Sequence, residues 1–375
     1  MLYKISLGIS IFCSFLVSEQ LNCAQGKPTI PSPITAIVSQ LNLSDPVRQA
    51  EAAAKISRWS SPPKLAIPML IKCLSDDTPV RLPQGFLTTP AQQASAALLK
   101  YGSVAVEPLQ KAWETSKENT QKNIAKLLIK MKSPSSAKIF IELLQQDDSS
   151  LRAEAVMALG VIRCDQAVEP LIKLIADREP SVRKEVALAL GEIGQPQAFS
   201  ALVSLLTDNV PGVRAAAVKA LGRLNHPESV PHLCEKLKDK EEIVRWSAAA
   251  SLGQLKDPRT VLPLIQALSD SHFLVRANAA WSLGLVGDRQ ATEPLICLLR
   301  DKDVQVKIQA VRALGRIGDS RAVESLILVL NERHPLLRRT TLKTLRRLTG
   351  VTGANEITFW QKWWEQNSNR YTLWP

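Results

Sequence analysis

From residue 134 onward, hydrophobic and polar positions recur with an unbroken 31-residue period. The marker of each copy is a hydrophobic residue followed by a basic one, with a glycine eight positions after the basic residue in six copies. An aspartate stands six positions before the basic residue in five copies. Such a period indicates a tandem array of one structural unit. The marker pairs are Leu151-Arg152, Val182-Arg183, Val213-Arg214, Val244-Arg245, Val275-Arg276, Val306-Lys307 and Leu337-Arg338.

Each unit predicts two helices joined by a turn. The first helix begins near a proline in several copies, as at Pro196 and Pro258, where the missing N–H costs nothing. Several first helices also carry a proline inside the helix, such as Pro170, and we expect this proline to kink the helix. The repeated aspartate falls in the turn. We expect its carboxylate to cap the second helix, and we expect the seven basic marker residues to pair with aspartates in a ladder.

The second helix of each unit is built on small residues. Its repeated glycine costs about 1 kcal/mol of helix propensity, so its recurrence suggests that no side chain fits at that position. A glycine or asparagine, such as Gly194 or Asn225, then ends the helix in a left-handed cap. A pair of helices cannot bury its apolar face alone, so neighbouring units must stack.

The pattern divides the chain into four segments. Residues 134–349 form seven regular repeats, and 28–133 carry divergent copies with a Pro-, Gly- and Thr-containing insertion at 82–90. About ten helix pairs result. Residues 350–375 predict a helix that places Trp360, Trp363 and Trp364 on one face, which we interpret as a cap over the last repeat. Residues 1–24 are set apart as a leader.

Proline in the first helix, aspartate in the turn, arginine in the second helix and the ending Ala158-Leu159-Gly160 resemble HEAT repeats. The Ala-Leu-Gly ending is similar to the short repeats of the phycobilisome lyase group. This resemblance implies an all-α, right-handed α-solenoid, a HEAT-like superhelix. It also implies two functions known in that group: attachment or detachment of bilins on antenna proteins, and protein interaction.

The leader predicts export. Lys4 is followed by an apolar run from Ile5 to Val17, which is too short to span a bilayer as a helix. We therefore expect a periplasmic or secreted protein without a transmembrane segment; the alternative is a cytoplasmic protein whose leader is not cleaved. Cys73, Cys234 and Cys297 lie in apolar helical stretches, and we interpret them as buried small side chains, with a disulfide left open.

The search for catalytic motifs is negative. The sequence has no Gly-rich phosphate loop and no Gly-x-Ser-x-Gly motif, and its four histidines stand apart from any metal-binding pattern. The HEAT-repeat enzyme deoxyhypusine hydroxylase binds iron through His-Glu pairs, which this chain lacks. We predict no catalytic residues, no metal and no cofactor.

The candidate binding site is a stripe of outward positions on the second helices, which in HEAT-like solenoids line the concave face. The net charge is +12, and several basic residues fall on this stripe together with two tryptophans, a combination enriched at binding hot spots. The alternative is that the tryptophans pack between helices and the charges are solvated. The insertion at 82–90 is a second candidate site. The stripe residues are Trp246, Trp281, Lys219, Arg223, Arg312, Arg316, Arg339, Lys343 and Arg347.

These observations favour a non-catalytic scaffold that binds an acidic protein or peptide on its concave face. The alternative, implied by the resemblance, is a phycobilisome-related bilin lyase subunit or antenna-protein chaperone. The predicted export argues against it, because phycobilisomes face the cytoplasm. Nucleic-acid binding is disfavoured by the predicted export and by the lack of a recognition motif.

Overall fold

The computed structural model describes residues 33–352 and 355–372, so the predicted leader at 1–24 lies outside the described residues. The chain falls into two compact units, Met1–Ser136 and Ala137–Pro375, each of which is described by itself. Both units consist of stacked helix pairs. The fold is an all-α solenoid, and the described residues contain three helix pairs in the first unit and seven in the second.

The first unit contains the divergent pairs α2/α3, α4/α5 and α6/α7, which start at Pro33. One pair is interrupted by a short antiparallel hairpin, β1 and β2. The elements are α2 (Pro33–Gln40), α3 (Pro46–Ser57), η1 (Lys64–Ala66), α4 (Ile67–Cys73), β1 (Val80–Arg81), β2 (Leu87–Thr88), α5 (Pro90–Tyr101), η2 (Gly102–Ala105), α6 (Val106–Thr115), α7 (Glu118–Met131) and η3 (Pro134–Ser136).

The insertion at 82–90 forms the turn and second strand of this hairpin. Val80 pairs with Thr88, and Gly85 turns the chain at a φ of 91°, a conformation that glycine adopts without strain. Val80 and Leu82 pack with Ala50 and Ala54 of α3 in a small apolar cluster. The hairpin is therefore anchored on the first helix pair.

The second unit contains seven regular pairs followed by a final helix. The elements are α8 (Ala137–Leu143), α9 (Ser149–Val161), η4 (Asp165–Ala167), α10 (Val168–Lys173), η5 (Leu174–Ala176), α11 (Pro180–Ile193), η6 (Pro196–Ala198), α12 (Phe199–Ser204), η7 (Leu205–Thr207), α13 (Pro211–Leu224), α14 (Ser229–Lys236), α15 (Glu242–Leu255), η8 (Pro258–Thr260), α16 (Val261–Ala267), α17 (Phe273–Val286), η9 (Arg289–Ala291), α18 (Thr292–Leu298), α19 (Val304–Ile317), η10 (Ser320–Ala322), α20 (Val323–Val329), α21 (Pro335–Thr349) and α22 (Ile357–Thr372).

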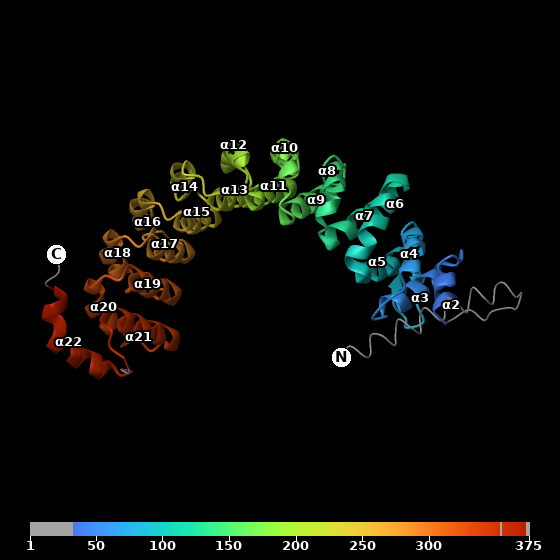
Figure 1. Ribbon diagram of the computed structural model, residues 1–375. Helices are drawn as coiled ribbons and strands as arrows, with labels where there is room; N and C mark the ends of the chain where they lie inside the picture. Colours follow the sequence, from blue (N-terminus) through green and yellow to red (C-terminus); the bar gives the residue numbers. More distant parts are fainter. Residues whose placement is uncertain (1–32, 353–354, 373–375) are drawn as a thin grey trace, which may run out of the picture. The chain divides into compact units, whose positions relative to one another are not determined.

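The two helices of each pair lie on different sides of this unit. Within it, the first helices, α10 to α20, follow the outer side of the curve, and the second helices, α11 to α21, follow the inner side (Figure 1). Successive second helices pack directly on one another, α9 on α11 and so on to α19 on α21. The inner side is therefore a continuous surface of second helices.

The repeated glycines allow this close stacking. A Cβ at Gly191 would lie 2.7 Å from the Cα of Ala220, and one at Gly284 would lie 2.6 Å from the Cα of Ala313. Neither backbone atom can move without displacing its helix. The prediction that no side chain fits at these glycines is confirmed. The predicted caps are confirmed as well, because Gly194 and Asn225 end their helices in the left-handed conformation.

The prediction of a proline kink in the first helices is wrong. The first helices that carry Pro170, Pro263 and Pro294 each follow a short 3₁₀ segment, and the α-helix starts only afterwards. Pro170, Pro263 and Pro294 each stand third in their α-helix. A proline in the first turn replaces an N–H that has no partner within the helix, so it breaks no hydrogen bond.

An Arg–Asp ladder joins neighbouring repeats of the second unit. Five marker arginines, Arg152 to Arg276, donate from Nε and Nη2 to both carboxylate oxygens of an aspartate 25 residues later, at 2.6–3.0 Å. Their Nη1 atoms donate to backbone carbonyls of the preceding turn at 2.7–3.0 Å. The arginine and aspartate side chains of these rungs are only 6–14% exposed. The ladder predicted for these five residues is therefore present.

The aspartates do not cap the second helices as expected. Asp177 stands two residues before the N-cap of α11, which is Glu179, and accepts a hydrogen bond of 2.9 Å from the Glu179 N–H. The four later ladder aspartates accept the equivalent backbone bond at 2.8–3.0 Å. The aspartate therefore folds the turn and holds the arginine of the previous repeat.

The last two marker positions depart from the predicted ladder. Lys307 pairs with Glu332 instead of an aspartate. Arg338 is exposed and has no ion-pair partner within the described residues; the residue 25 positions later is Trp363, which lies inside helix α22 and not in a turn. The prediction that all seven basic residues pair with aspartates is wrong for these two.

We predict that the second unit loses stability in acid. Burial acts to raise the pKa of Asp177, but hydrogen bonds from Arg152 and from the Glu179 N–H outweigh it and lower the pKa overall; Asp208, Asp239, Asp270 and Asp301 are lowered in the same way. A depressed folded-state pKa gives stability above the unfolded pKa of about 3.9 that is lost as the pH falls through the folded pKa. Melting followed by circular dichroism should give a constant Tm between about pH 7 and 5 and a fall below about pH 4. A Tm unchanged down to pH 3 would contradict this role of the ladder.

The C-terminal helix α22 packs on α20 and the turn η10 that precedes it. Trp360 is fully buried there and contacts Phe359 and Trp363 edge-on, whereas Trp363 and Trp364 are half-buried. The helix therefore covers the first helix of the last pair.

The cysteines differ in burial. Cys73 is buried, and burial raises its thiol pKa to about 11. Cys234 is half-buried, and Cys297 is exposed on the outer helix α18, so the prediction of a buried side chain is wrong for Cys297 and only partly right for Cys234. Within residues 33–352 and 355–372, Cys73, Cys164, Cys234 and Cys297 are free thiols.

Candidate partner-binding face

The nine candidate residues lie on the second helices α13 to α21, on the inner side of the second unit (Figure 1). Lys219 of α13 and Trp246 of α15 are brought together: the ammonium group lies 4.9 Å from the ring centroid. Partial desolvation lowers the pKa of Lys219, and the nearby cations Arg223 and Lys184 lower it further. Trp246 is half-buried, so part of its ring stays open beside the cation.

Two candidates are partly engaged by the fold. Arg223 pairs with Glu192 of the preceding repeat, so its charge is partly neutralised. Trp281 is half-buried on α17, one turn before Gly284, and the Arg316 Cδ lies 3.5 Å from the site of a Cβ at Gly284.

Five candidates line one groove between α19 and α21. The groove has a volume of about 400 Å³. Arg312 and Arg316 come from α19, and Arg339, Lys343 and Arg347 come from α21; all five are exposed. Gly315, Leu336, Thr340 and Thr344 complete its lining, so the described residues around it include five cations and no carboxylate. Such an arrangement attracts an anionic ligand and offers guanidinium groups for bidentate bonds.

The stripe changes character along the unit. Its first copy presents Met157 and Val161, which are 50% and 51% exposed. The middle copies add the half-buried Trp246 and Trp281, and the last two copies are basic. Because Lys219 and Arg223 of α13 precede the two tryptophans, a ligand that follows the second helices would meet a mixture of apolar and basic groups first and a run of cations at the end.

Two further cations of α21 were missed as candidates. Arg338 and Arg346 line a second groove, of about 450 Å³, on the other flank of this helix, together with Arg339 and Lys343. Arg346 also donates a 2.6 Å hydrogen bond to Asn355. The sequence held a signal for Arg338, since a tryptophan replaces the aspartate that its marker position would pair with, but the regular marker pattern concealed it.

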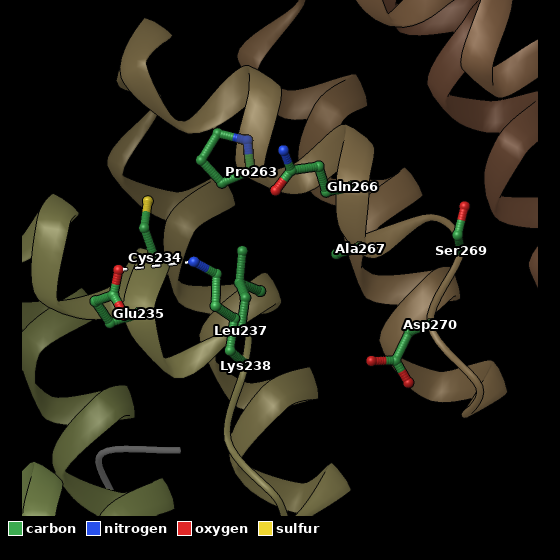
Figure 2. A pocket seen from close by; sticks show the side chains of 9 residues that line it. All are labelled: Cys234, Glu235, Leu237, Lys238, Pro263, Gln266, Ala267, Ser269 and Asp270. Atoms are coloured by element: carbon green, nitrogen blue, oxygen red, sulfur yellow. Dashed lines mark ion pairs between the residues drawn. The ribbon is translucent and has the colours of Figure 1, made fainter.

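A different type of pocket lies on the outer side. It has a volume of about 330 Å³ and is lined by residues of α14 and α16 and the turns that follow them (Figure 2). Its lysine, Lys238, pairs with Glu235 at 3.9 Å, and its aspartate, Asp270, already binds Arg245. Burial raises the pKa of the Cys234 thiol that borders it. Its charged groups are thus satisfied within the fold, unlike those of the groove between α19 and α21.

Neither a metal cluster nor a membrane-spanning helix emerges from the part of the chain that the structure describes. Among these residues, no three His, Cys, Asp or Glu side chains are placed to hold a metal ion. No helix within the same residues is both long and apolar enough to cross a bilayer.

The stacked helix pairs define an α-solenoid repeat protein. The model of the family described as HEAT repeats matches residues 137–216, 205–261 and 261–346, which together span more than half of the chain. The chain therefore belongs to the HEAT-repeat family.

Solved structures with similar folds include three solenoids. A structure of Kap95p bound to RanGDP is 15% identical, covers 90% of this chain and 51% of its own, and has a TM-score of 0.56. YibA of Escherichia coli is 18% identical over 65% and 92% of the two chains, with a TM-score of 0.49. The CpcE–CpcF complex of phycocyanin lyase from Nostoc sp. PCC7120 is 22% identical over 61% and 94%, with a TM-score of 0.40. At these identities the likeness concerns the fold. The comparison with curated proteins gives no match.

Proposed function

We propose that this HEAT-repeat solenoid is a non-catalytic scaffold that binds an acidic segment of a partner protein along its second helices. The observation that carries this proposal is the groove in which Arg312, Arg316 and three cations of α21 gather without a carboxylate among the described lining residues. An acidic peptide would neutralise these charges and accept bidentate hydrogen bonds from the arginines.

The apolar part of the stripe supports a protein partner rather than a simple polyanion. Trp246 and Trp281 are half-buried, so each offers a ring face held by its surroundings. Aromatic anchors of this kind, beside arginines, are typical of the centres of protein interfaces. A partner segment that combines apolar residues with a run of acidic residues would match these groups along the second helices.

The proposal includes the compartment. The predicted leader and export would place the partner outside the cytoplasm. The start of the mature chain, determined by mass spectrometry together with the fraction that contains it, tests this part. An intact Met1 in the cytosol would contradict export and would make transfer of a bilin to an antenna protein the next assay for the alternative function.

Binding of a labelled peptide tests the interface. We predict that a peptide with leucines followed by a run of Glu and Asp binds the full-length protein, as measured by fluorescence anisotropy, and that binding weakens as salt rises. Replacing Trp246 and Trp281 together by alanine should lower the affinity by about tenfold or more, because truncating an interface residue of this kind typically costs about 1 kcal/mol or more. Helicity by circular dichroism should not change.

Two controls make this test specific. Phe86→Ala, at the exposed tip of the hairpin in the first unit, should leave the affinity unchanged; a loss there would favour the insertion as the binding site. A peptide with Lys and Arg in place of the acidic residues should not bind. Equal affinity of the acidic and basic peptides, or stronger binding of a single-stranded oligonucleotide, would overturn the proposed partner class.

A further inference from the structure

The Arg–Asp ladder shows which hydrogen bonds a marker arginine makes when another repeat follows its own. In each of the five rungs the guanidinium group is almost buried and donates two parallel hydrogen bonds to one carboxylate. Its Nη1 atom also donates to a backbone carbonyl in the turn of its own repeat, as in Arg214. The carboxylate always comes from the next repeat. This geometry is repeated with little variation, with hydrogen bonds of 2.6–3.0 Å in the five rungs.

Arg338 stands at the same position of the last repeat but lacks that carboxylate. The residue 25 positions later in the sequence is Trp363, which lies inside α22 and not in a turn between paired helices, and among the described residues no side chain forms an ion pair with Arg338. The helix that follows, α22, packs on α20 and η10, that is, on the first-helix side of the last pair. The flank of α21 that carries Arg338 therefore borders a groove instead of another repeat.

The surroundings of Arg338 suit an anion. Arg339, Lys343 and Arg346 line the same groove, and its other three lining residues are neutral. A guanidinium keeps its charge at every physiological pH. Arg338, Arg339 and Lys343 are exposed there, and the described residues that line this groove of about 450 Å³ include no carboxylate.

We propose that Arg338 is the last position of the Arg–Asp ladder, without a carboxylate of its own chain, and we call it the open rung. It binds a carboxylate of the partner through two parallel hydrogen bonds, as the arginines of the five internal rungs bind their aspartates. The inference rests on the proposed function, since the carboxylate would belong to the same acidic segment. It extends the site to the second flank of α21. Because Arg339 and Lys343 line both grooves, a single acidic segment crossing α21 can reach both.

The carboxylate has two sources with the same chemistry. A side chain of Asp or Glu and the C-terminal carboxylate of the partner both present two coplanar oxygens. Amidating the C-terminus of the peptide distinguishes them. A C-terminal carboxylate predicts a loss of affinity on amidation that disappears in Arg338→Ala, and a side-chain carboxylate predicts no effect of amidation.

The test compares three variants of the full-length protein with the acidic peptide as probe. Arg338→Ala and Arg338→Lys should both weaken binding by about tenfold to a hundredfold, because lysine keeps the charge but cannot form the two parallel bonds. Arg333→Ala, which removes a nearby exposed arginine outside the groove, should leave the affinity unchanged. The Tm of all three should equal that of the original protein.

Four results would overturn the inference. Full affinity of Arg338→Lys would reduce the role of Arg338 to general charge. A Tm lowered by Arg338→Ala as by an internal rung variant would mean that the fold already uses this arginine. Full affinity of both Arg338 variants, with binding still abolished by reversing the charges of the groove between α19 and α21, would remove the open rung but leave the proposed function intact. Failure of the original protein to bind the acidic peptide removes the proposed function, and the open rung with it.

Discussion

Reversing three charges in the groove between α19 and α21 should abolish binding of the acidic peptide. In the variant Arg312→Glu, Arg316→Glu, Arg339→Glu, two cations remain among three new carboxylates. Like charges brought together at an interface cost several kcal/mol, so we expect the affinity to fall at least about a hundredfold, equivalent to about 3 kcal/mol. Fluorescence anisotropy at low and high salt measures both the loss and its electrostatic origin.

A matched variant separates the groove from the overall charge. Lys138→Glu, Lys173→Glu, Arg289→Glu makes the same change in net charge on exposed residues of α8, α10 and η9. If binding depends on the groove, this variant should keep most of its affinity, with a small decrease that vanishes in salt. Equal losses in the two variants would show that the peptide responds only to the total charge, and the groove would no longer be a candidate site.

The groove could be predicted in part from the sequence. The 31-residue phase placed Arg312, Arg316, Arg339, Lys343 and Arg347 on one stripe, since equivalent positions of stacked helices align. The phase did not show that Arg223 would pair with Glu192, or that Lys219 would lie over Trp246. Those contacts join different repeats and depend on side-chain conformations, which periodicity does not determine.

The ladder shows a second limit of the sequence pattern. The recurrence of arginine and aspartate predicted their pairing, but it did not show that an arginine such as Arg214 binds the carboxylate of the next repeat, Asp239, and only the backbone carbonyl of Asp208 in its own turn. Which aspartate an arginine reaches depends on how far the next repeat is offset along the solenoid. That offset also explains Arg338: it belongs to the seventh helix pair of the second unit, and among the described residues no further pair supplies a carboxylate.

The short 3₁₀ segments before the first helices were likewise missed. Their hydrogen bonds close after three residues, as from Ala198 to Gln195, and move the start of the α-helix past the first proline. Hydrophobic spacing in such brief segments does not distinguish a 3₁₀ turn from an α-helical one. The interpretation of Pro170 as a kink assumed an α-helix that begins several residues earlier, whereas α10 begins at Val168.

Arg214→Ala should destabilise the second unit more than any substitution on its surface. The change leaves the Asp239 side chain, 7% exposed, without the guanidinium that now binds both its oxygens. Removing one member of a buried pair typically costs about 3–5 kcal/mol, because the remaining charge stays buried and uncompensated. The midpoint of urea unfolding should fall accordingly, and hydrogen exchange should accelerate first in α13 and α15, since solenoids can unfold repeat by repeat.

Two variants identify the cause of this loss. Arg338→Ala removes the same side chain at the equivalent position of the last repeat, where no carboxylate is left behind, and should cost little. Replacing both members of the buried pair, Arg214→Met with Asp239→Asn, should recover most of the stability, because no unpaired charge remains and the asparagine can still accept the hydrogen bond from the Glu241 N–H. This double variant should also show a smaller loss of Tm in acid, since one of the five depressed aspartates is gone. If Arg214→Ala lowers the free energy of unfolding no more than Arg338→Ala does, the Arg–Asp pairs inside the ladder are not needed for stability. The arginines with and without a bound carboxylate would then not differ in their contribution to stability.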